Sequence, residues 1–285
     1  MTLQQPFFKL AVLAAALTVA CAAEATPYAF GSISFTNLQM TGLNSNNVTA
    51  LSTTTKSDAG YPTSPSGVSR SGTTDVLQSY AGPGPFPAEN TFTQALQSSF
   101  GTRGDALITG NLLTNPAMTA AAVAEGRLAP LGGTLTAASS GGTSTGLTFN
   151  FSTGGPATLC LTFNASDLLV ANTNAIGDGA SAAVSSSFSI VGTDNSYSKS
   201  FAPKELNAST SSTFGNGNGL ISNASKAYSY QFNLGPGTYQ FSFLTGAQQF
   251  LQDPSAVPEP TPLALLGIGA LGFGIARTRK NRKQA

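Results

Sequence analysis

Three carboxylates, Glu89, Asp105 and Glu125, are the residues of this chain that could do acid–base chemistry. Two carboxyl groups held roughly 5–9.5 Å apart can hydrolyse a glycosidic bond, but nothing in the sequence sets the separation of these three. Solvated or turn-capping carboxylates are far more common. The chain contains no histidine, which excludes Ser-His-Asp and Cys-His catalysis and any imidazole-based metal site. We therefore expect no enzymatic activity, and a glycan-active enzyme is the weakest of three interpretations.

Arg103-Gly104-Asp105 is the tripeptide that animal adhesion receptors bind. We interpret it here as a turn in which Gly104 supplies an unusual backbone angle and Asp105 acts as a cap.

Several side chains that carry oxygen ligands fall in predicted loops, where calcium could bind. Their spacing matches no calcium-loop signature, and turn formation is the simpler interpretation. We predict no metal site and no cofactor. These residues are Asn172, Asn174, Asp178, Asp194 and Asn195.

Cys160 would be the only cysteine left after removal of the first 25 residues, so a disulfide within the mature chain is impossible. Thr158 and Thr162 share its side of a predicted strand. An exposed thiol in an oxidising compartment would form linked dimers. We expect instead a buried, inert thiol, covered by a loop such as residues 132–146.

The composition is poor in charge and rich in small polar residues. Charged residues make up 9% of the chain, with 31 Gly and a formal net charge of +1. Residues 26–256 hold seven basic and ten acidic side chains, a net charge of −3. No basic surplus exists to neutralise phosphates, so we expect no nucleic-acid partner.

Residues 1–25 have the pattern of a secretory signal peptide. Lys9 precedes an apolar run over residues 10–20 that only Thr18 interrupts. Small residues follow at Ala23 and Ala25, which predicts cleavage by signal peptidase before Thr26. A lipoprotein site at Cys21 is a weaker alternative, because the expected Leu three positions earlier is absent.

The C-terminus has three parts in a fixed order. An extended motif comes first, followed by fourteen uncharged residues at 263–276 and then by a basic tail. A helix of that length spans roughly 21 Å, against about 30 Å of hydrocarbon, which suits transient rather than permanent insertion into the inner membrane. The basic tail should stay cytoplasmic. The motif is Val257, Pro258, Glu259 and Pro260, and the tail carries Arg277, Arg279, Lys280, Arg282 and Lys283.

This order resembles the PEP-CTERM sorting signal of Gram-negative bacteria over about the last 29 residues. The resemblance implies processing by an exosortase, a membrane transpeptidase-like enzyme. It also implies a host that makes exopolysaccharide and biofilm material. The residues themselves do not establish these properties.

The region between the two ends, residues 26–256, reads as one strand-rich extracytoplasmic domain. Apolar residues alternate with polar ones in several runs, which predicts strands with one apolar face. Such strands need a second sheet to cover that face, so we predict an antiparallel β-sandwich. The alternating apolar positions include Leu147, Phe149, Phe151, Leu159, Leu161, Phe163, Val184, Phe188 and Ile190.

Two turns predict hairpins. Residues 228–234 and 239–243 alternate on either side of Gly235-Pro236-Gly237. A second hairpin is predicted around the turn at residues 152–156.

Two short helices and two loops complete the prediction for the body. Residues 89–101 place Phe92 and Leu96 at helical spacing, and an alanine-rich segment at residues 115–126 begins with a favourable Asn-Pro start. The Ser/Thr/Gly-rich stretches at residues 44–74 and 132–146 read as mobile loops.

Three short stretches of the body resemble one group of exosortase-dependent surface proteins, the EDSAP type. They are residues 88–92, 103–106 and 124–126. That group implies no chemical activity, so the resemblance supports the sorting interpretation alone.

We thus predict a mainly β protein, with an antiparallel β-sandwich-like body and one or two short helices. A signal peptide at residues 1–25 precedes this body, and a sorting signal at residues 257–285, made of the motif, a short transmembrane helix and the basic tail, follows it. Its expected function is that of an exported, exosortase-processed cell-surface or matrix protein associated with exopolysaccharide. The alternative is a carbohydrate-binding module that retains exopolysaccharide through Tyr and Phe on one sheet face.

Overall fold

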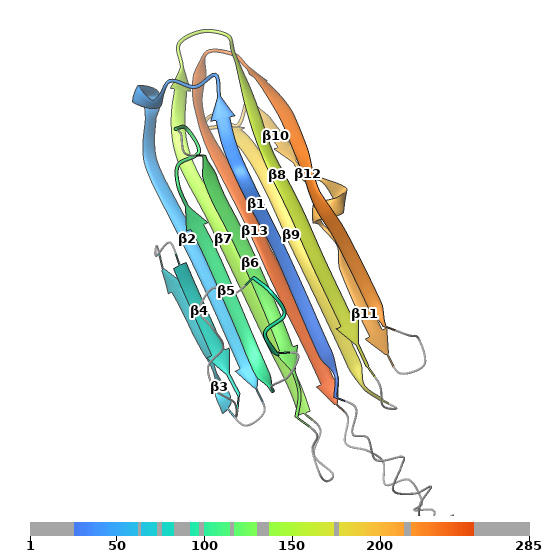
Figure 1. Cartoon of the computed structure of the whole chain (residues 1–285). Coiled ribbons are helices and arrows are strands. Elements are labelled where there is room, and N and C mark those ends of the chain that lie inside the picture. The colour runs from blue at the N-terminus through green and yellow to red at the C-terminus, as the bar shows by residue number, and fades with distance from the viewer. Residues whose placement is uncertain are drawn as a thin grey trace, which may run out of the picture. The chain divides into compact units, whose positions relative to one another are not determined.

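The computed structural model of this chain describes the body of the protein. The described residues are 26–61, 64–72, 76–82, 92–96, 100–114, 117–129, 137–173, 177–213 and 218–253. They form two antiparallel sheets, named sheet A and sheet B below, whose long strands run alongside one another (Figure 1).

Sheet A contains six strands, and neighbouring strands in it are antiparallel. Their spatial order is β12 (Gly219–Leu234), β8 (Ala157–Asn172), β1 (Tyr28–Thr41), β6 (Met118–Arg127), β5 (Gly101–Thr109) and β4 (Val76–Ala81).

Sheet B contains seven strands, again antiparallel. Six follow one path, and the seventh, β11 (Ser209–Thr213), pairs with β9 beside it. The path is β10 (Ser198–Phe201), β9 (Gly179–Gly192), β13 (Gly237–Asp253), β7 (Ala137–Thr153), β2 (Val48–Tyr61) and β3 (Ser64–Gly72). Two 3-10 turns, η1 (Ser45–Asn47) and η3 (Lys204–Leu206), lie in the connections.

Aromatic side chains from both sheets fill the core. Phe35 of sheet A packs edge-on against Phe243 of sheet B at 5.2 Å between ring centroids, and Phe163 stacks on Phe188 at 4.9 Å. The apolar positions that alternate in the sequence point inward, as predicted. The mainly β, antiparallel prediction is confirmed.

Both predicted hairpins are wrong. The turn at residues 235–237 joins β12 of sheet A to β13 of sheet B, and the turn at residues 152–156 joins β7 of sheet B to β8 of sheet A. The two strands that each turn joins therefore share no hydrogen-bond ladder. Across the core, β13 lies against β6 and β1, whereas β7 lies against β5 and β6. An alternating run determines which face of a strand is buried, but it does not determine which neighbouring strand supplies the hydrogen bonds.

The alanine-rich segment predicted as a helix is strand β6 over its described part. Ala120, Ala122 and Ala124 point into the core, where they are fully buried. Small side chains let β6 approach the opposite sheet closely. Packing between the layers outweighs the high helix propensity of alanine.

Residues 92–96 do not form the predicted α-helix. The described part of this segment lies on the outer face of sheet A. There Phe92 packs on a small cluster of Tyr28, Phe30, Val123 and Val170. The segment acts as a cover over one patch of the sheet.

The two predicted loops are largely strands. Residues 48–61 and 64–72 form β2 and β3, and residues 137–146 belong to β7. The register of β7 with β13 runs without a break from Ala137 to Thr153. Long Ser/Thr/Gly-rich strands are stable here because neighbours on both sides complete their backbone hydrogen bonds.

Within the described residues, no helix has the length and apolar character needed to cross a membrane. The predicted signal peptide and the predicted C-terminal helix lie outside those residues.

Candidate functional site

The predicted sorting residues lie outside the described part of the chain, so the structure does not place them. The exception is Thr26, the predicted first residue of the mature protein, whose Oγ1 accepts a hydrogen bond of 3.1 Å from Arg127 Nε. The undescribed residues are Ala23, Ala25, Val257, Pro258, Glu259, Pro260, Arg277, Arg279, Lys280, Arg282 and Lys283.

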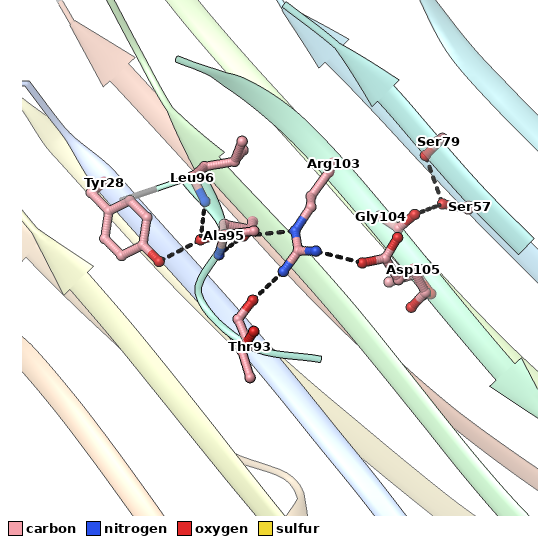
Figure 2. Close-up of polar contacts among 11 residues, drawn as sticks. Tyr28, Ser57, Ser79, Thr93, Ala95, Leu96, Arg103, Gly104 and Asp105 are labelled. Carbon is pink, nitrogen blue, oxygen red and sulfur yellow. Dashed lines mark hydrogen bonds and ion pairs between the residues drawn. The ribbon is translucent and has the colours of Figure 1, made fainter. Parts of the chain in front are cut away.

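The most concentrated polar chemistry of the body surrounds Arg103, whose side chain is completely buried. Its Nη1 lies 2.8 Å from Asp105 Oδ2, and its Nε lies 2.7 Å from Glu125 Oε2. Its Nη2 donates to the backbone carbonyl of Thr93. Figure 2 shows the guanidinium between Asp105 and Thr93. We call Arg103, Asp105, Glu125 and Tyr28 the buried charge cluster.

Glu125 connects this cluster to the covering segment. Its Oε1 accepts from the Tyr28 hydroxyl at 2.6 Å and from the Leu96 amide at 3.1 Å. Its Oε2 accepts from the Ala95 amide at 3.1 Å in addition to Arg103. One carboxylate thus fixes two backbone amides of residues 92–96 to strand β6. Burial, together with the adjacent carboxylate, raises the pKa of the Tyr28 hydroxyl far above its ordinary value, so this group stays a donor.

This geometry bears on two functions considered from the sequence, a catalytic carboxylate pair and a receptor-binding Arg-Gly-Asp tripeptide. Asp105 and Glu125 do come together, but both carboxylates are fully buried and bind the same guanidinium. Glu89 lies outside the described residues. The Arg-Gly-Asp tripeptide is equally enclosed, and a receptor could not contact it in the folded protein. The cluster can therefore hold the cover in place, but its charges are not presented to a ligand.

The interpretation of Arg103-Gly104-Asp105 as a turn is wrong, since the tripeptide lies inside β5. Gly104 is needed for close approach: a Cβ there would lie 2.5 Å from Ser57 Oγ. That hydroxyl donates to the Gly104 carbonyl at 2.8 Å and lies 2.6 Å from Ser79 Oγ (Figure 2). Sheets A and B are thus joined by hydrogen bonds on one side of β5, and the buried charge cluster lies on the other.

Two of the three stretches that resemble the EDSAP type, residues 103–106 and 124–126, pair with each other at this point. Arg103 is directly opposite Glu125 in the β5–β6 register, and Gly104 is opposite Ala124. Phe92, the described residue of the first stretch, packs on Tyr28 and Val123 of the same sheet. Sequence reasoning listed these residues separately and missed the cluster. The available signal was an Arg and an acidic residue, two positions apart, in each of two apolar segments of a chain with few charges, namely Arg103 with Asp105 and Arg127 with Glu125.

A second polar group lies where β12 faces η3. Asp167 is 4% exposed, and its Oδ2 accepts from Asn223 Nδ2 at 3.0 Å, whereas its Oδ1 has no hydrogen-bond partner among the described residues. Lys226 and Glu205 form an exposed ion pair of 2.9 Å nearby. Burial raises the pKa of Asp167, the Asn223 bond opposes this shift, and the charge of Glu205 adds to it.

We predict that Asp167→Asn raises the free energy of unfolding at neutral pH by about 1 kcal/mol, because it removes a poorly solvated charge. A carboxyl group with a raised pKa stabilises the fold below its ordinary pKa. That contribution is lost as the pH rises toward the folded-state value. The gain should therefore be present at neutral pH and vanish in acid, as measured by urea unfolding at both conditions.

Asp194→Asn is the matched control. Hydrogen bonds from the Ser196 hydroxyl and amide lower the pKa of this exposed carboxyl, so its removal should not stabilise the protein at any pH. Equal effects of the two substitutions, or a gain for Asp167→Asn that persists in acid, would contradict the assignment.

Asp194 forms a turn, as the sequence interpretation of the Asn/Asp loops predicted. Its Oδ1 accepts from the Ser196 amide at 3.0 Å and from the Ser196 hydroxyl at 2.7 Å. Asn174 lies outside the described residues. Among the described residues, no group of three or more Cys, Asp or Glu is arranged to hold a metal ion.

The prediction of a buried Cys160 is wrong. The thiol is partly exposed on the outer side of β8, with Sγ 3.6 Å from Ser229 Oγ. The loop expected to cover it is part of β7 in the other sheet over residues 137–146. The alternation of β8 placed Cys160 opposite the core correctly, but the described part of the expected cover lies in sheet B.

Most of the Phe and Tyr residues that the carbohydrate-binding alternative invokes pack in the core. The alternating Phe residues of β7, β8, β9 and β13 line the core, and Tyr228 and Tyr230 stack on Phe163 and Phe201. Phe250 is the one large exposed aromatic side chain among the described residues.

Comparison with known proteins finds a match at the C-terminus. Residues 256–280 match the PEP-CTERM protein-sorting motif. No curated protein and no solved structure matches the chain. The matched region contains the Pro258-Glu259-Pro260 motif, the apolar segment and the first part of the basic tail. The prediction of a PEP-CTERM sorting signal from this order of features is confirmed over residues 256–280.

Proposed function

We propose that this protein is a surface or extracellular-matrix protein of a Gram-negative bacterium, exported across the inner membrane, processed by an exosortase and associated with exopolysaccharide. The PEP-CTERM motif at residues 256–280 carries this proposal, since the motif implies an exosortase as processing enzyme. The basic tail after it suits a cytoplasmic end.

The body supports a non-catalytic role. The chain has no histidine, and the two described candidate carboxylates, Asp105 and Glu125, are enclosed around Arg103. A β-sandwich with a polar, weakly charged outer surface suits a component that tolerates hydrated polymer around it. The first test of this role is the form in which the protein leaves the cell.

The exported protein should begin at Thr26 and lack the basic tail, because signal peptidase cleaves after small residues and the sorting enzyme removes the C-terminal signal. Intact-mass and N-terminal analysis of protein collected outside the producing cell measures both ends at once. A mature chain that starts at Met1 or at an acylated Cys21, or that retains Lys283, would contradict the proposed route.

A further inference from the structure

A groove of about 540 Å³ lies on the outer face of sheet A. It combines one cation, several amides and hydroxyls, and an apolar floor. Its lining residues are Thr26, Tyr28, Gln94, Arg127, Val170, Asn172, Asn218 and Leu220.

The strand register explains why these side chains meet. Tyr28 of β1 is directly opposite Arg127 of β6 on one side and Asn172 of β8 on the other. Leu220 of β12 is opposite Val170. Directly opposite residues of paired strands project from the same face of a sheet, so four strands contribute to one surface.

Arg127 is held in a defined orientation at this groove. Its guanidinium carbon lies 5.5 Å from the centroid of the Phe100 ring, and its Nε donates to Thr26 Oγ1. In the part of the chain that the structure describes, no carboxylate forms an ion pair with Arg127, in contrast to Arg103. The half-buried guanidinium therefore offers its remaining donors to an anion from outside.

The rest of the groove suits a hydroxylated ring. Leu220 is 68% exposed, the largest exposed fraction among the large apolar side chains of the described residues, and it lies beside Val170. Such a pair can pack against the C–H face of a sugar. The amides of Asn172 and Asn218 can both donate to and accept from its hydroxyls.

We propose that this groove binds a carboxylate-bearing saccharide of the uronic-acid class, with the carboxylate on Arg127 and the sugar ring on Leu220 and Val170. The proposal rests on the proposed association with exopolysaccharide and names the chemistry of that partner. The proposal is based on charge complementarity. Among the described residues, the Arg127 guanidinium has no carboxylate partner, and it lies beside the neutral amides of Asn172 and Asn218.

Export would strengthen this site. Thr26 lines the groove, and it is also the predicted first residue after signal-peptide cleavage. Cleavage at that bond places a free α-ammonium at the groove beside Arg127. The exported protein should then bind a carboxylate more tightly than the uncleaved precursor, which carries an uncharged amide at this position.

Binding of trigalacturonate to the exported protein, measured by calorimetry, tests the proposal. The methyl ester of the same trisaccharide keeps the rings and removes the charge, and an oligoglutamate of equal charge keeps the charge and removes the rings. We expect affinity for both comparison ligands to fall about tenfold or more. Equal binding of oligoglutamate would make the groove a general anion site and overturn the proposal.

Arg127→Gln should reduce affinity for trigalacturonate about tenfold or more, because a charge-assisted hydrogen bond is lost. Lys199→Gln on exposed strand β10 removes the same charge from the other sheet and should change nothing. Equal losses of trigalacturonate affinity in both variants would show that the protein's overall charge alone attracts the ligand, and would contradict a binding site at Arg127.

Leu220→Asn gives an independent test that does not threaten the fold, since this side chain is already exposed. It should weaken trigalacturonate binding, whereas Leu51→Asn, at an exposed leucine of sheet B, should not. Export and processing are scored separately by mass. A correctly processed protein that does not bind trigalacturonate overturns the groove alone, and an unprocessed protein overturns the proposed function.

Discussion

Arg103→Met should lower the free energy of unfolding by about 3–5 kcal/mol, the usual cost of leaving buried charges without their partner. Asp105 and Glu125 would remain enclosed without a cation, and the carbonyl of Thr93 would lose its donor. Since small domains are stable by only about 5–15 kcal/mol, this substitution should remove a large share of the stability. Urea unfolding of the exported protein measures the change.

Lys56→Met is the matched control for this prediction. Lys56 pairs with Asp58 at 3.1 Å, but the two side chains are 58% and 38% exposed, so the loss should stay below about 1 kcal/mol. If Arg103→Met costs no more than Lys56→Met, the buried charge cluster does not stabilise the fold. Hydrogen exchange gives a second readout. The backbone amides of Ala95 and Leu96 donate hydrogen bonds to Glu125, so Glu125→Ala should make these two amides exchange faster.

Glu259→Ala should leave the precursor in the inner membrane with its C-terminal tail attached, reducing the processed form from most of the protein to a small fraction. The reason is that Glu259 is the acidic residue between the two prolines of the matched motif. Thr261→Ala, two positions later, is the control and should be processed normally. Membrane fractionation with intact-mass analysis distinguishes the two forms.

A second variant separates recognition of the motif from retention in the membrane. Changing all five basic tail residues to Gln removes the charges that oppose translocation, and fourteen apolar residues give little compensating hydrophobic area. This variant should pass to the far side with its tail uncleaved, whereas Glu259→Ala should stay in the membrane. Normal processing of Glu259→Ala would show that the motif is not what the enzyme recognises.

The sequence alone determined the sorting signal and the strand-rich character of the body. A linear signal is read by its order along the chain, so Pro258-Glu259-Pro260, an apolar segment and a basic tail suffice without a fold. Alternation also determined which side of each strand is buried, as Phe149 and Phe163 illustrate. Both properties depend only on residues that are near one another in the sequence, so a sequence pattern is enough to predict them.

Tertiary structure decided which strands pair. The turns after Thr153 and Leu234 look like hairpin turns, yet each joins strands of different sheets. It also decided that residues 118–127 form a strand. Alanine's small side chain allows the two sheets to pack closely, and this packing stabilises the strand more than alanine's helix propensity would stabilise a helix. Hydrogen-bond partners in a sheet depend on residues far away in the chain, which no local pattern reports.

The charged residues show the same division most clearly. Arg103 and Arg127 are each a single basic residue in a weakly charged strand, and the sequence does not distinguish them. In the structure, two carboxylates and a covering segment enclose Arg103, whereas Arg127 lines an open groove beside Thr26. The physical reason is register: β5 and β6 place Glu125 opposite Arg103, and β1 and β6 place Tyr28 opposite Arg127.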